Sequence, residues 1–233
     1  MAVNKEAYLQ IKSELDAKQV TLVAVSKTKP ASDILELYEL GQRDFGENYV
    51  QELVEKAEQL PKDIRWHFIG HLQSNKVKYI APFVHLIHGV DSEKLLKEIN
   101  KQAAKLNKTI DVLLQIHIAK EETKFGLDED ELNLIIRQFD DLKIENAIVC
   151  GLMGMASFSE DMDLVRSEFQ FLKKIFDKSK PLFTIQHLPA GNQGSTFNIL
   201  SMGMSGDYKL AIEEGSTMVR IGSLLFGARN YMQ

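Results

Sequence analysis

Short apolar runs alternate with longer segments of helical period along the whole chain. The runs are rich in β-branched residues, which favour strands, and several are continuously apolar, as strands buried on both faces of a parallel sheet are. We predict eight strands, at residues 21–26, 43–46, 65–70, 84–88, 111–118, 148–153, 198–202 and 217–221. We predict helices at residues 6–17, 32–40, 50–59, 74–80, 92–106, 128–139, 164–176, 207–214 and 224–232.

The sequence also predicts the two ends of one helix and the buried face of another. Ser32 is placed to cap the N-terminus of the helix at residues 32–40, and Gly41 is placed to end it. In the helix at residues 92–106, four apolar residues share one face, which we expect to be buried: Leu95, Leu96, Ile99 and Ala103.

Eight strand–helix units predict an α/β fold, a single (β/α)8 barrel of the TIM type with an extra N-terminal helix. An open doubly wound sheet is the alternative, because it shows the same alternation, although usually with fewer strands. No Gly/Ser linker, low-complexity tract or block of like charges marks a boundary, so we predict that residues 1–233 form one domain. The stretch at 181–198 is predicted to be a long loop over the mouth of the barrel, with a turn at 191–194.

The charge balance and the apolar content exclude several classes of protein. The 28 Lys and Arg residues against 33 Asp and Glu residues give a net charge of −5, whereas nucleic-acid-binding domains usually carry a basic excess. The 44% hydrophobic content excludes intrinsic disorder, and no apolar run approaches the ~18 residues of a membrane span. The first 17 residues lack the apolar core of a signal peptide, and the single cysteine, Cys150, cannot form an internal disulfide. We therefore predict a cytoplasmic protein that binds neither nucleic acid nor membrane.

Polar residues follow several predicted strands at the end where TIM-type barrels carry their active sites. Lys27 comes just after the first strand. It is either a solvated lysine at the rim or a partly desolvated amine with a lowered pKa, which can form a Schiff base with an aldehyde. Arg220 lies in the otherwise apolar run of the eighth strand, so its guanidinium needs either an internal ion-pair partner or a bound ligand.

The turn after the eighth strand has features of a phosphate site. Gly222 and Ser223 precede the last predicted helix, where a glycine allows close approach of the backbone and the backbone N–H groups favour phosphate. Barrels of this type commonly bind phosphate near strands seven and eight. The Ser-Met-Gly-Met-Ser segment at 201–205 can add hydroxyl donors to the same site.

The histidines do not predict a metal site. His67 and His71 are four residues apart on a predicted strand end, where they do not share a face as two histidines on a helix would. His85 and His88 are expected on opposite faces of the fourth strand. Cys150 is predicted to be a small core residue rather than a nucleophile, because no base is placed beside it.

Taken together, seven stretches of the sequence resemble the YggS/PROSC family, the pyridoxal phosphate homeostasis proteins. They occur in the family's order and extend from residue 24 to residue 227, so the resemblance covers nearly the whole chain. The stretches are AVSKTKP at 24–30, FGENYVQE at 45–52, WHFIGHLQSNK at 66–76, KFG at 124–126, GLMGMA at 151–156, LSMGMS at 200–205 and VRIGSLLFG at 219–227.

The resemblance implies a PLP fold-type III barrel, like the N-terminal domain of alanine racemase, with pyridoxal 5′-phosphate (PLP) as cofactor. Lys27 would hold PLP as a Schiff base. Arg220 would face the pyridine nitrogen and keep it unprotonated, which weakens the ring as an electron sink. The other residues that the resemblance implies at the site are Ser201, Ser205, Gly222 and Ser223 around the phosphate, Asn48 near the ring, and His67 and Met204 as lining residues.

The resemblance leaves two functions of different classes. In the first, the protein is not an enzyme but a carrier that binds and buffers PLP and delivers it to PLP-dependent apo-enzymes. In the second, it is a PLP-dependent amino-acid racemase or a related fold-type III enzyme. A sugar-phosphate barrel enzyme with a Schiff-base lysine is a third reading from the fold alone, although it does not explain Arg220 beside the phosphate site.

The number of catalytic bases favours the carrier. Racemisation needs one base on each face of the substrate carbanion, and Lys27 serves one face. In alanine racemase a tyrosine from a second, β-rich domain of the partner subunit serves the other face, whereas this chain ends at Gln233, just after the predicted barrel. Tyr49 and Tyr208 are expected near the mouth, but nothing in the sequence directs either at the ring. We therefore expect a carrier and, without the second domain, a monomer.

Overall fold

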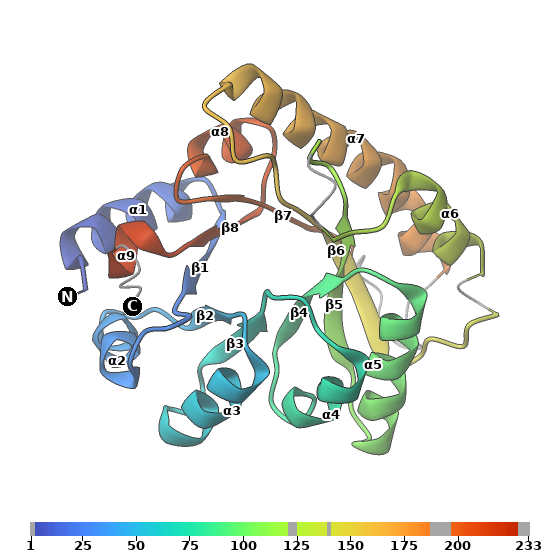
Figure 1. Cartoon of the computed structure of the whole chain (residues 1–233), viewed down its shortest axis with the longest axis horizontal. Helices are drawn as coiled ribbons and strands as arrows, with labels where there is room; N and C mark the ends of the chain where they lie inside the picture. Colours follow the sequence, from blue (N-terminus) through green and yellow to red (C-terminus); the bar gives the residue numbers. More distant parts are fainter. Residues whose placement is uncertain (1–2, 121–124, 139–140, 187–196, 228–233) are drawn as a thin grey trace.

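The structure is a computed structural model of the chain, and it describes residues 3–120, 125–138, 141–186 and 197–227. Within these residues, eight parallel strands close into a barrel, in which each strand pairs with the next and β8 pairs with β1 (Figure 1). The strands are β1 Thr21–Val25, β2 Asp44–Glu47, β3 Arg65–Phe68, β4 Leu86–Val90, β5 Ile110–Ile116, β6 Ala147–Gly154, β7 Ile199–Met204 and β8 Met218–Ile221.

Helices alternate with the strands and surround the barrel (Figure 1). They are α1 Lys5–Ala17, α2 Ala31–Glu39, α3 Val50–Gln59, the 3₁₀ turn η1 Ser74–Lys76, α4 Val77–Ile80, α5 Glu93–Lys105, α6 Glu129–Gln138, α7 Met162–Gln186, α8 Tyr208–Glu213 and α9 Ser223–Phe226. α1 precedes the first strand and packs beside α9, where the amide of Asn4 donates to the carbonyl of Leu225 at 2.8 Å. The predicted barrel with an extra N-terminal helix is therefore confirmed. Of the helices that the structure describes, none has the length and apolar character needed to cross a bilayer.

The ends of α2 agree only in part with the prediction. α2 begins at Ala31 with Pro30 as its N-cap residue, so the prediction that Ser32 caps this helix is wrong. Proline suits a helix start because its φ is already restricted and the N–H that it lacks would have no partner there. Gly41 ends the helix as predicted, with φ +99° and its amide donating to the carbonyl of Tyr38 at 2.9 Å.

α7 is longer than the sequence predicts. It continues past Pro181 to Gln186, and Phe176 and Phe183 both stack on Phe197, with ring centroids 5.1 and 4.7 Å apart. Burial of these rings outweighs the helix-breaking effect of the proline. Because α7 runs back from the end of β6, its C-terminus lies at the opposite end of the barrel from the mouth. The prediction of a loop over the mouth is therefore wrong for residues 181–186, and the predicted turn at 191–194 lies outside the described residues.

The core lies both outside and inside the barrel. Between strands and helices, the predicted apolar face of α5 is buried, and the Ser92 hydroxyl caps this helix by accepting the amide of Leu95 at 3.4 Å. The apolar side chains that fill the barrel interior, Cys150 among them as predicted, are Val23, Leu86, Leu113, Cys150, Met153 and Met218. Burial and the nearby Asp111 raise the pKa of the Cys150 thiol to about 12, which suits a core residue rather than a nucleophile.

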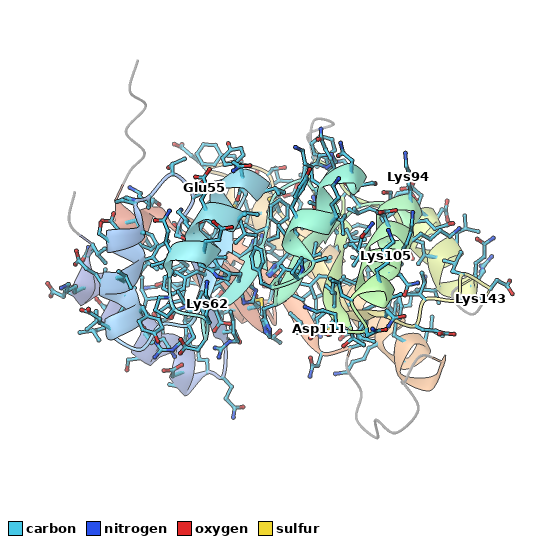
Figure 2. The ribbon with its side chains drawn as sticks, turned by 90° about the horizontal axis from the view of Figure 1, so that it is seen from below. Glu55, Lys62, Lys94, Lys105, Asp111 and Lys143 are labelled. Carbon is cyan, nitrogen blue, oxygen red and sulfur yellow. The ribbon has the colours of Figure 1, made fainter. Side chains whose placement is uncertain are left out.

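The C-terminal ends of the strands form one end of the barrel, the mouth, and their N-terminal ends form the other, the base. Figure 2 shows this polarity from the side: Lys94, near the start of α5, lies toward the mouth, Lys105 at its end lies lower, and Asp111 on β5 lies near the base. Every loop from a strand to the following helix therefore opens at the mouth, where barrels of this type carry their sites.

Candidate functional site

A cavity of about 560 Å³ lies at the mouth, and we call it the mouth cavity. Its size is typical of small-molecule sites. The structure brings seven of the nine predicted cofactor-site residues to it: Lys27, Asn48, Met204, Ser205, Arg220, Gly222 and Ser223. The other two, His67 and Ser201, do not line it.

Lys27 is half-buried in the loop after β1, and the residue before it is held by buried ionic groups. Lys56 on α3 donates to the carbonyl of Ser26 at 2.8 Å and to the carboxylate of Glu47 at 2.7 Å. The Ser26 hydroxyl donates to the same carboxylate at 2.6 Å. The end of β1 is thereby tied to both β2 and α3.

The residue after Lys27 is held by the same group of side chains. Thr28 has φ +63°, a left-handed conformation that is strained for a β-branched residue. Its amide donates to Glu52 at 2.6 Å, and Glu52 accepts Lys56 at 2.7 Å. We call Ser26, Glu47, Glu52 and Lys56 the Lys56 cluster, and it contacts the backbone on both sides of Lys27.

Three members of the Lys56 cluster are buried, and the fourth, Glu52, is half-buried. Glu47 is 0% exposed and Lys56 is 7% exposed. Burial raises the pKa of the Glu47 carboxyl, and the ammonium of Lys56 together with the hydroxyl of Ser26 opposes this shift. Glu47 Oε2 has no hydrogen-bond partner in the part of the chain that the structure describes. Removing Lys56 would therefore leave a charge with little compensation.

Arg220 forms part of the wall of the mouth cavity and is 3% exposed. Its Nη1 donates to the hydroxyl of Ser201 at 2.7 Å and its Nη2 to the carbonyl of Gly154 at 3.1 Å. Burial lowers the pKa of the guanidinium to about 10, against an opposing effect of Asp207, so the group stays charged at neutral pH. It can therefore donate to a ligand but cannot accept from one.

Another part of the cavity offers serine hydroxyls at the start of α9. The Ser205 hydroxyl accepts the amide of Gly222 at 3.2 Å, and Ser223 is the first residue of α9. A Cβ on Gly222 would lie 3.2 Å from the carbonyl oxygen of Val25, closer than side chains usually pack. This packing accounts for the glycine, while the serine hydroxyls and the helix start suit an anionic group such as phosphate.

Asn48 supplies a polar atom that lacks a partner at this site. Its Oδ1 is buried and makes no hydrogen bond with any residue that the structure describes. An unpaired buried amide oxygen is costly, so a ligand that donates to it, or to the amide nitrogen in the flipped orientation, would remove that cost. Together with Lys27, Arg220 and the hydroxyls of Ser205 and Ser223, the site fits an aldehyde-bearing, aromatic phosphate.

His67 and Ser201 lie inside the barrel, below the mouth cavity. Both are fully buried, and Ser201 contacts the guanidinium of Arg220 rather than the cavity. His67 Nδ1 lies 2.9 Å from Nε2 of His88. Because neither residue lines the mouth cavity, they do not join the other seven.

A second cavity, of about 480 Å³, lies at the base, and we call it the basal cavity. Three of the residues that line it, Asp44, His67 and His85, bring one ligand atom each within 4.8 Å of the others. Arg65 donates to both carboxylate oxygens of Asp44, and His67 Nε2 lies 3.0 Å from Oδ1. These hydrogen bonds already satisfy Asp44, and the guanidinium opposes a cation, so we assign no metal to this group.

The expectation that His85 and His88 face opposite ways is wrong. β4 begins at Leu86, so His85 lies outside the strand and does not follow its alternation. Both rings pack against the ring of His67, with centroids 5.4 and 5.1 Å away.

Several residues at the mouth cavity were not among the nine predicted cofactor-site residues. Met155 and Phe158 follow β6, and Phe158 is 97% exposed at the rim. Lys29 lines the cavity too, and its Nζ donates to the carbonyl of Phe226 at 2.6 Å. Met155 could have been found from its position just beyond a strand end, whereas no sequence pattern marks an exposed rim phenylalanine.

Neither tyrosine considered as a second base lines the mouth cavity. Tyr49 is 60% exposed and lines a separate surface pocket with His71 and Tyr79. Tyr208 is buried and its hydroxyl bonds to Glu14 of α1, which together raise its pKa.

Comparison with known proteins gives consistent results. Residues 5–230 match the sequence profile of the family described as "Alanine racemase, N-terminal domain". The chain is 42% identical over 211 residues to a pyridoxal phosphate homeostasis protein of Aquifex aeolicus, covering 90% of this chain and 87% of that protein. PipY of Synechococcus elongatus, solved with PLP bound, superposes with a TM-score of 0.82 at 32% identity, covering 95% of this chain and 99% of PipY. Alanine racemase from Bartonella henselae, at a TM-score of 0.68 and 16% identity over 100% of this chain and 62% of that one, shares the fold.

Proposed function

The chain belongs to the pyridoxal phosphate homeostasis proteins, a family built on the alanine racemase N-terminal domain, and we propose that it binds PLP in the mouth cavity. In this proposal the protein serves intracellular PLP homeostasis: it binds and buffers the cofactor and delivers it to PLP-dependent apo-enzymes. The observation that carries the proposal is the mouth cavity itself, which gathers a lysine amine, a buried arginine and two serine hydroxyls around one space.

Each part of the cofactor has a partner of suitable chemistry. Lys27 would hold it through a Schiff base, in which the amine condenses with the PLP aldehyde and one water molecule leaves. Arg220 would face the ring nitrogen, which would accept a hydrogen bond and stay unprotonated, because a guanidinium only donates. Ser205, Gly222 and Ser223 would hold the phosphate at the start of α9.

The protein's own groups suit storage of a reactive aldehyde. Bound PLP supplies an electron-accepting ring and an electrophilic carbon. The Lys56 cluster holds the backbone on both sides of Lys27, which fixes the point of the chain from which the amine extends. The unpaired Oδ1 of Asn48 supports a bound ligand as the missing partner.

A PLP-dependent racemase is the alternative function. It needs a base on the face of the ring opposite Lys27, and neither Tyr49 nor Tyr208 lines the mouth cavity. Arg220 against the ring nitrogen would also disfavour carbanion chemistry, since it would limit the ring as an electron sink. The positions of the two tyrosines are the observation that supports a carrier without enzymatic activity. That the protein is cytoplasmic and monomeric, and that residues 1–233 act as one PLP-binding domain, stay predictions.

The proposal is tested by absorbance titration of the purified protein with PLP. The wild type should develop a visible band that saturates with one PLP per chain, and Lys27→Ala should not. Lys209→Ala is the matched control, because Lys209 is an exposed lysine on α8 outside the mouth cavity, and it should behave as the wild type. An equal band in Lys27→Ala would refute the site. Racemisation of amino acids by the PLP-loaded wild type, lost in Lys27→Ala, would refute the carrier.

A further inference from the structure

Polar side chains from five different strands form a continuous row of hydrogen bonds through the barrel interior. We call this row the interior chain; it consists of Arg220, Ser201, His88, His67 and Asp44, on β8, β7, β4, β3 and β2. The distances between neighbours, in this order, are 2.7, 3.3, 2.9 and 3.0 Å. The interior chain thus extends from the wall of the mouth cavity to the basal cavity.

The interior chain occupies space that barrels of this type usually fill with branched apolar side chains. Ser201, His88 and His67 are 0% exposed, and the two ends, Arg220 and Asp44, are 3% and 8% exposed. A buried polar group without a partner costs free energy, so each member depends on the next one. A buried row of this kind is stable only when every hydrogen bond between its members is formed.

The two ends of the interior chain set the direction of its hydrogen bonds. Arg220 can only donate, so the Ser201 oxygen accepts from it and the single Ser201 hydrogen is left for Nδ1 of His88. Burial is the main cause that holds the pKa of His88 well below its ordinary value, and the positive charge of Arg220 acts in the same direction, so His88 is neutral. Its hydrogen therefore sits on Nε2 and is donated to Nδ1 of His67.

The basal end fits the same direction. Because His67 Nδ1 accepts from His88, the hydrogen of the His67 ring sits on Nε2, which donates to the carboxylate of Asp44. Arg65 donates to that carboxylate from the other side. In the reversed arrangement of neutral rings, the lone pair of His67 Nε2 would face the carboxylate oxygen at 3.0 Å, which is repulsive. The ends therefore select one tautomer for both rings.

We propose that Ser201 and His88, supported by His67 and Asp44, are positioning residues that hold the Arg220 guanidinium in one orientation toward the mouth cavity. This inference rests on the proposed function, because PLP is the ligand that Arg220 would face. The guanidinium is held at Nη1 by Ser201 and at Nη2 by the carbonyl of Gly154, so loss of the serine removes one of two anchors. The interior chain also makes the two histidines sensitive to the cofactor, although neither lines its cavity.

The tautomers are tested directly by long-range ¹H–¹⁵N correlation on the ¹⁵N-labelled protein without PLP, at pH 7.5. His67→Gln and His88→Gln identify the two rings among the six histidines. We expect both rings to be neutral with the hydrogen on Nε2, and both to shift when PLP is added. A ring with its hydrogen on Nδ1, or a doubly protonated His67, would overturn the assigned direction.

The positioning role is tested by Ser201→Ala. The matched control is Ser216→Ala, because Ser216 is also buried between β7 and β8 but donates to backbone carbonyls, Met202 among them at 2.8 Å, outside the interior chain. We expect Ser201→Ala to weaken PLP binding about tenfold and to abolish the PLP-induced shift of the His67 ring, while the control stays within about twofold of the wild type. Thermal unfolding of both variants checks that they fold.

The outcomes separate the two proposals. If Ser201→Ala binds PLP as the control does and still transmits the shift to His67, the positioning role is refuted, while PLP binding stands. If the wild type shows no PLP-dependent band, the proposed function is refuted, and the tautomer measurement still decides whether the interior chain exists in the assigned direction.

Discussion

Loss of the ammonium at the centre of the Lys56 cluster should destabilise the fold strongly. We predict that Lys56→Met lowers the free energy of unfolding by about 3 kcal/mol at pH 8. Methionine keeps most of the side-chain volume, so the change removes the charge and its hydrogen bonds rather than packing. Those bonds join Lys56 to Ser26, Glu47 and Glu52, and the first two of these partners are 0% exposed.

The magnitude follows from the burial of Glu47. Removing one partner of a buried ion pair typically costs ~3–5 kcal/mol, because the remaining charge is uncompensated. The lower end applies here, since Glu47 keeps the hydroxyl of Ser26 as a donor and can take up a proton instead of staying charged. A loss of ~3 kcal/mol would be a large part of the ~5–15 kcal/mol typical of a folded domain.

The loss should also depend on pH in a defined direction. Burial raises the folded-state pKa of Glu47, and Lys56 is the main group that opposes it, so the variant's pKa rises further above the unfolded value of ~4.3. A raised folded-state pKa contributes stability below the unfolded pKa, and this contribution is lost as pH rises through the folded one. The deficit of Lys56→Met should therefore be larger at pH 8 than at pH 5.

Urea unfolding followed by the fluorescence of the single tryptophan, Trp66 on β3, measures this deficit. Lys97→Met is the control, because Lys97 forms an exposed ion pair with Glu93 on α5 and its side chain is 49% exposed. The control should change stability by less than ~0.5 kcal/mol. Equal losses in both variants, or a Lys56→Met deficit that does not shrink toward pH 5, would refute the reasoning.

Three further substitutions test other parts of the fold by the same urea assay. Thr28→Gly should raise the free energy of unfolding by about 0.5 kcal/mol. The left-handed φ costs a threonine ~1–2 kcal/mol, and glycine removes this cost but offsets part of the gain, because it loses more conformational entropy on folding. A lower free energy of unfolding would mean that Thr28 is not strained. Gly151→Ala should cost at least ~3 kcal/mol, because Gly151 has φ +154° and a Cβ on it would overlap the carbonyl oxygen of Ile199. An unchanged free energy of unfolding would contradict the close contact of β6 with β7 at this position. Asp44→Asn should cost about 1 kcal/mol at pH 7, and the cost should begin to shrink as pH falls below ~4. Burial raises the Asp44 pKa, but hydrogen bonds led by Arg65 hold it well below its ordinary value, so the stabilisation disappears fully only below that folded-state pKa; a pH-independent cost would refute the pairing.

The sequence predicts the barrel and the end at which the site lies because both depend on periodicity and strand order. Lys27, Asn48 and Ser223 each follow a strand, so the topology alone brings them to the mouth. The motifs around them add the chemistry, and the structure gathers those residues at one cavity. Nothing beyond local pattern and parallel strand order is needed for this part.

The depth of a residue along its strand was harder to predict. Ser201 and Ser205 share one motif, but in the pairing of β7 with β8, Met204 lies opposite Arg220 while Ser201 lies opposite Met218, deeper in the barrel. Ser201 therefore accepts a hydrogen bond from the guanidinium of Arg220 and does not line the mouth cavity. A single sequence shows which residues alternate inward, but the height at which they meet depends on the stagger between strands.

Long-range contacts account for the other differences. α7 continues past Pro181 because Phe176 and Phe183 stack on Phe197, which lies beyond the end of the helix. The interior chain joins residues on five strands, and no local pattern marks His88 as a neighbour of Ser201, 113 residues away. Tertiary packing decides both features, and it overrides local preference where the two conflict.

The most direct test of the central claim is to trap PLP on the protein and map where it is attached. The wild type is incubated with PLP, reduced with borohydride and digested, and the modified peptide is identified by mass spectrometry. The account predicts one reduced pyridoxyl group per chain, on the peptide that contains Lys27, with the label absent from Lys27→Ala. A label spread over exposed lysines such as Lys97 and Lys209, unchanged in Lys27→Ala, would contradict the assignment of the mouth cavity as the PLP site.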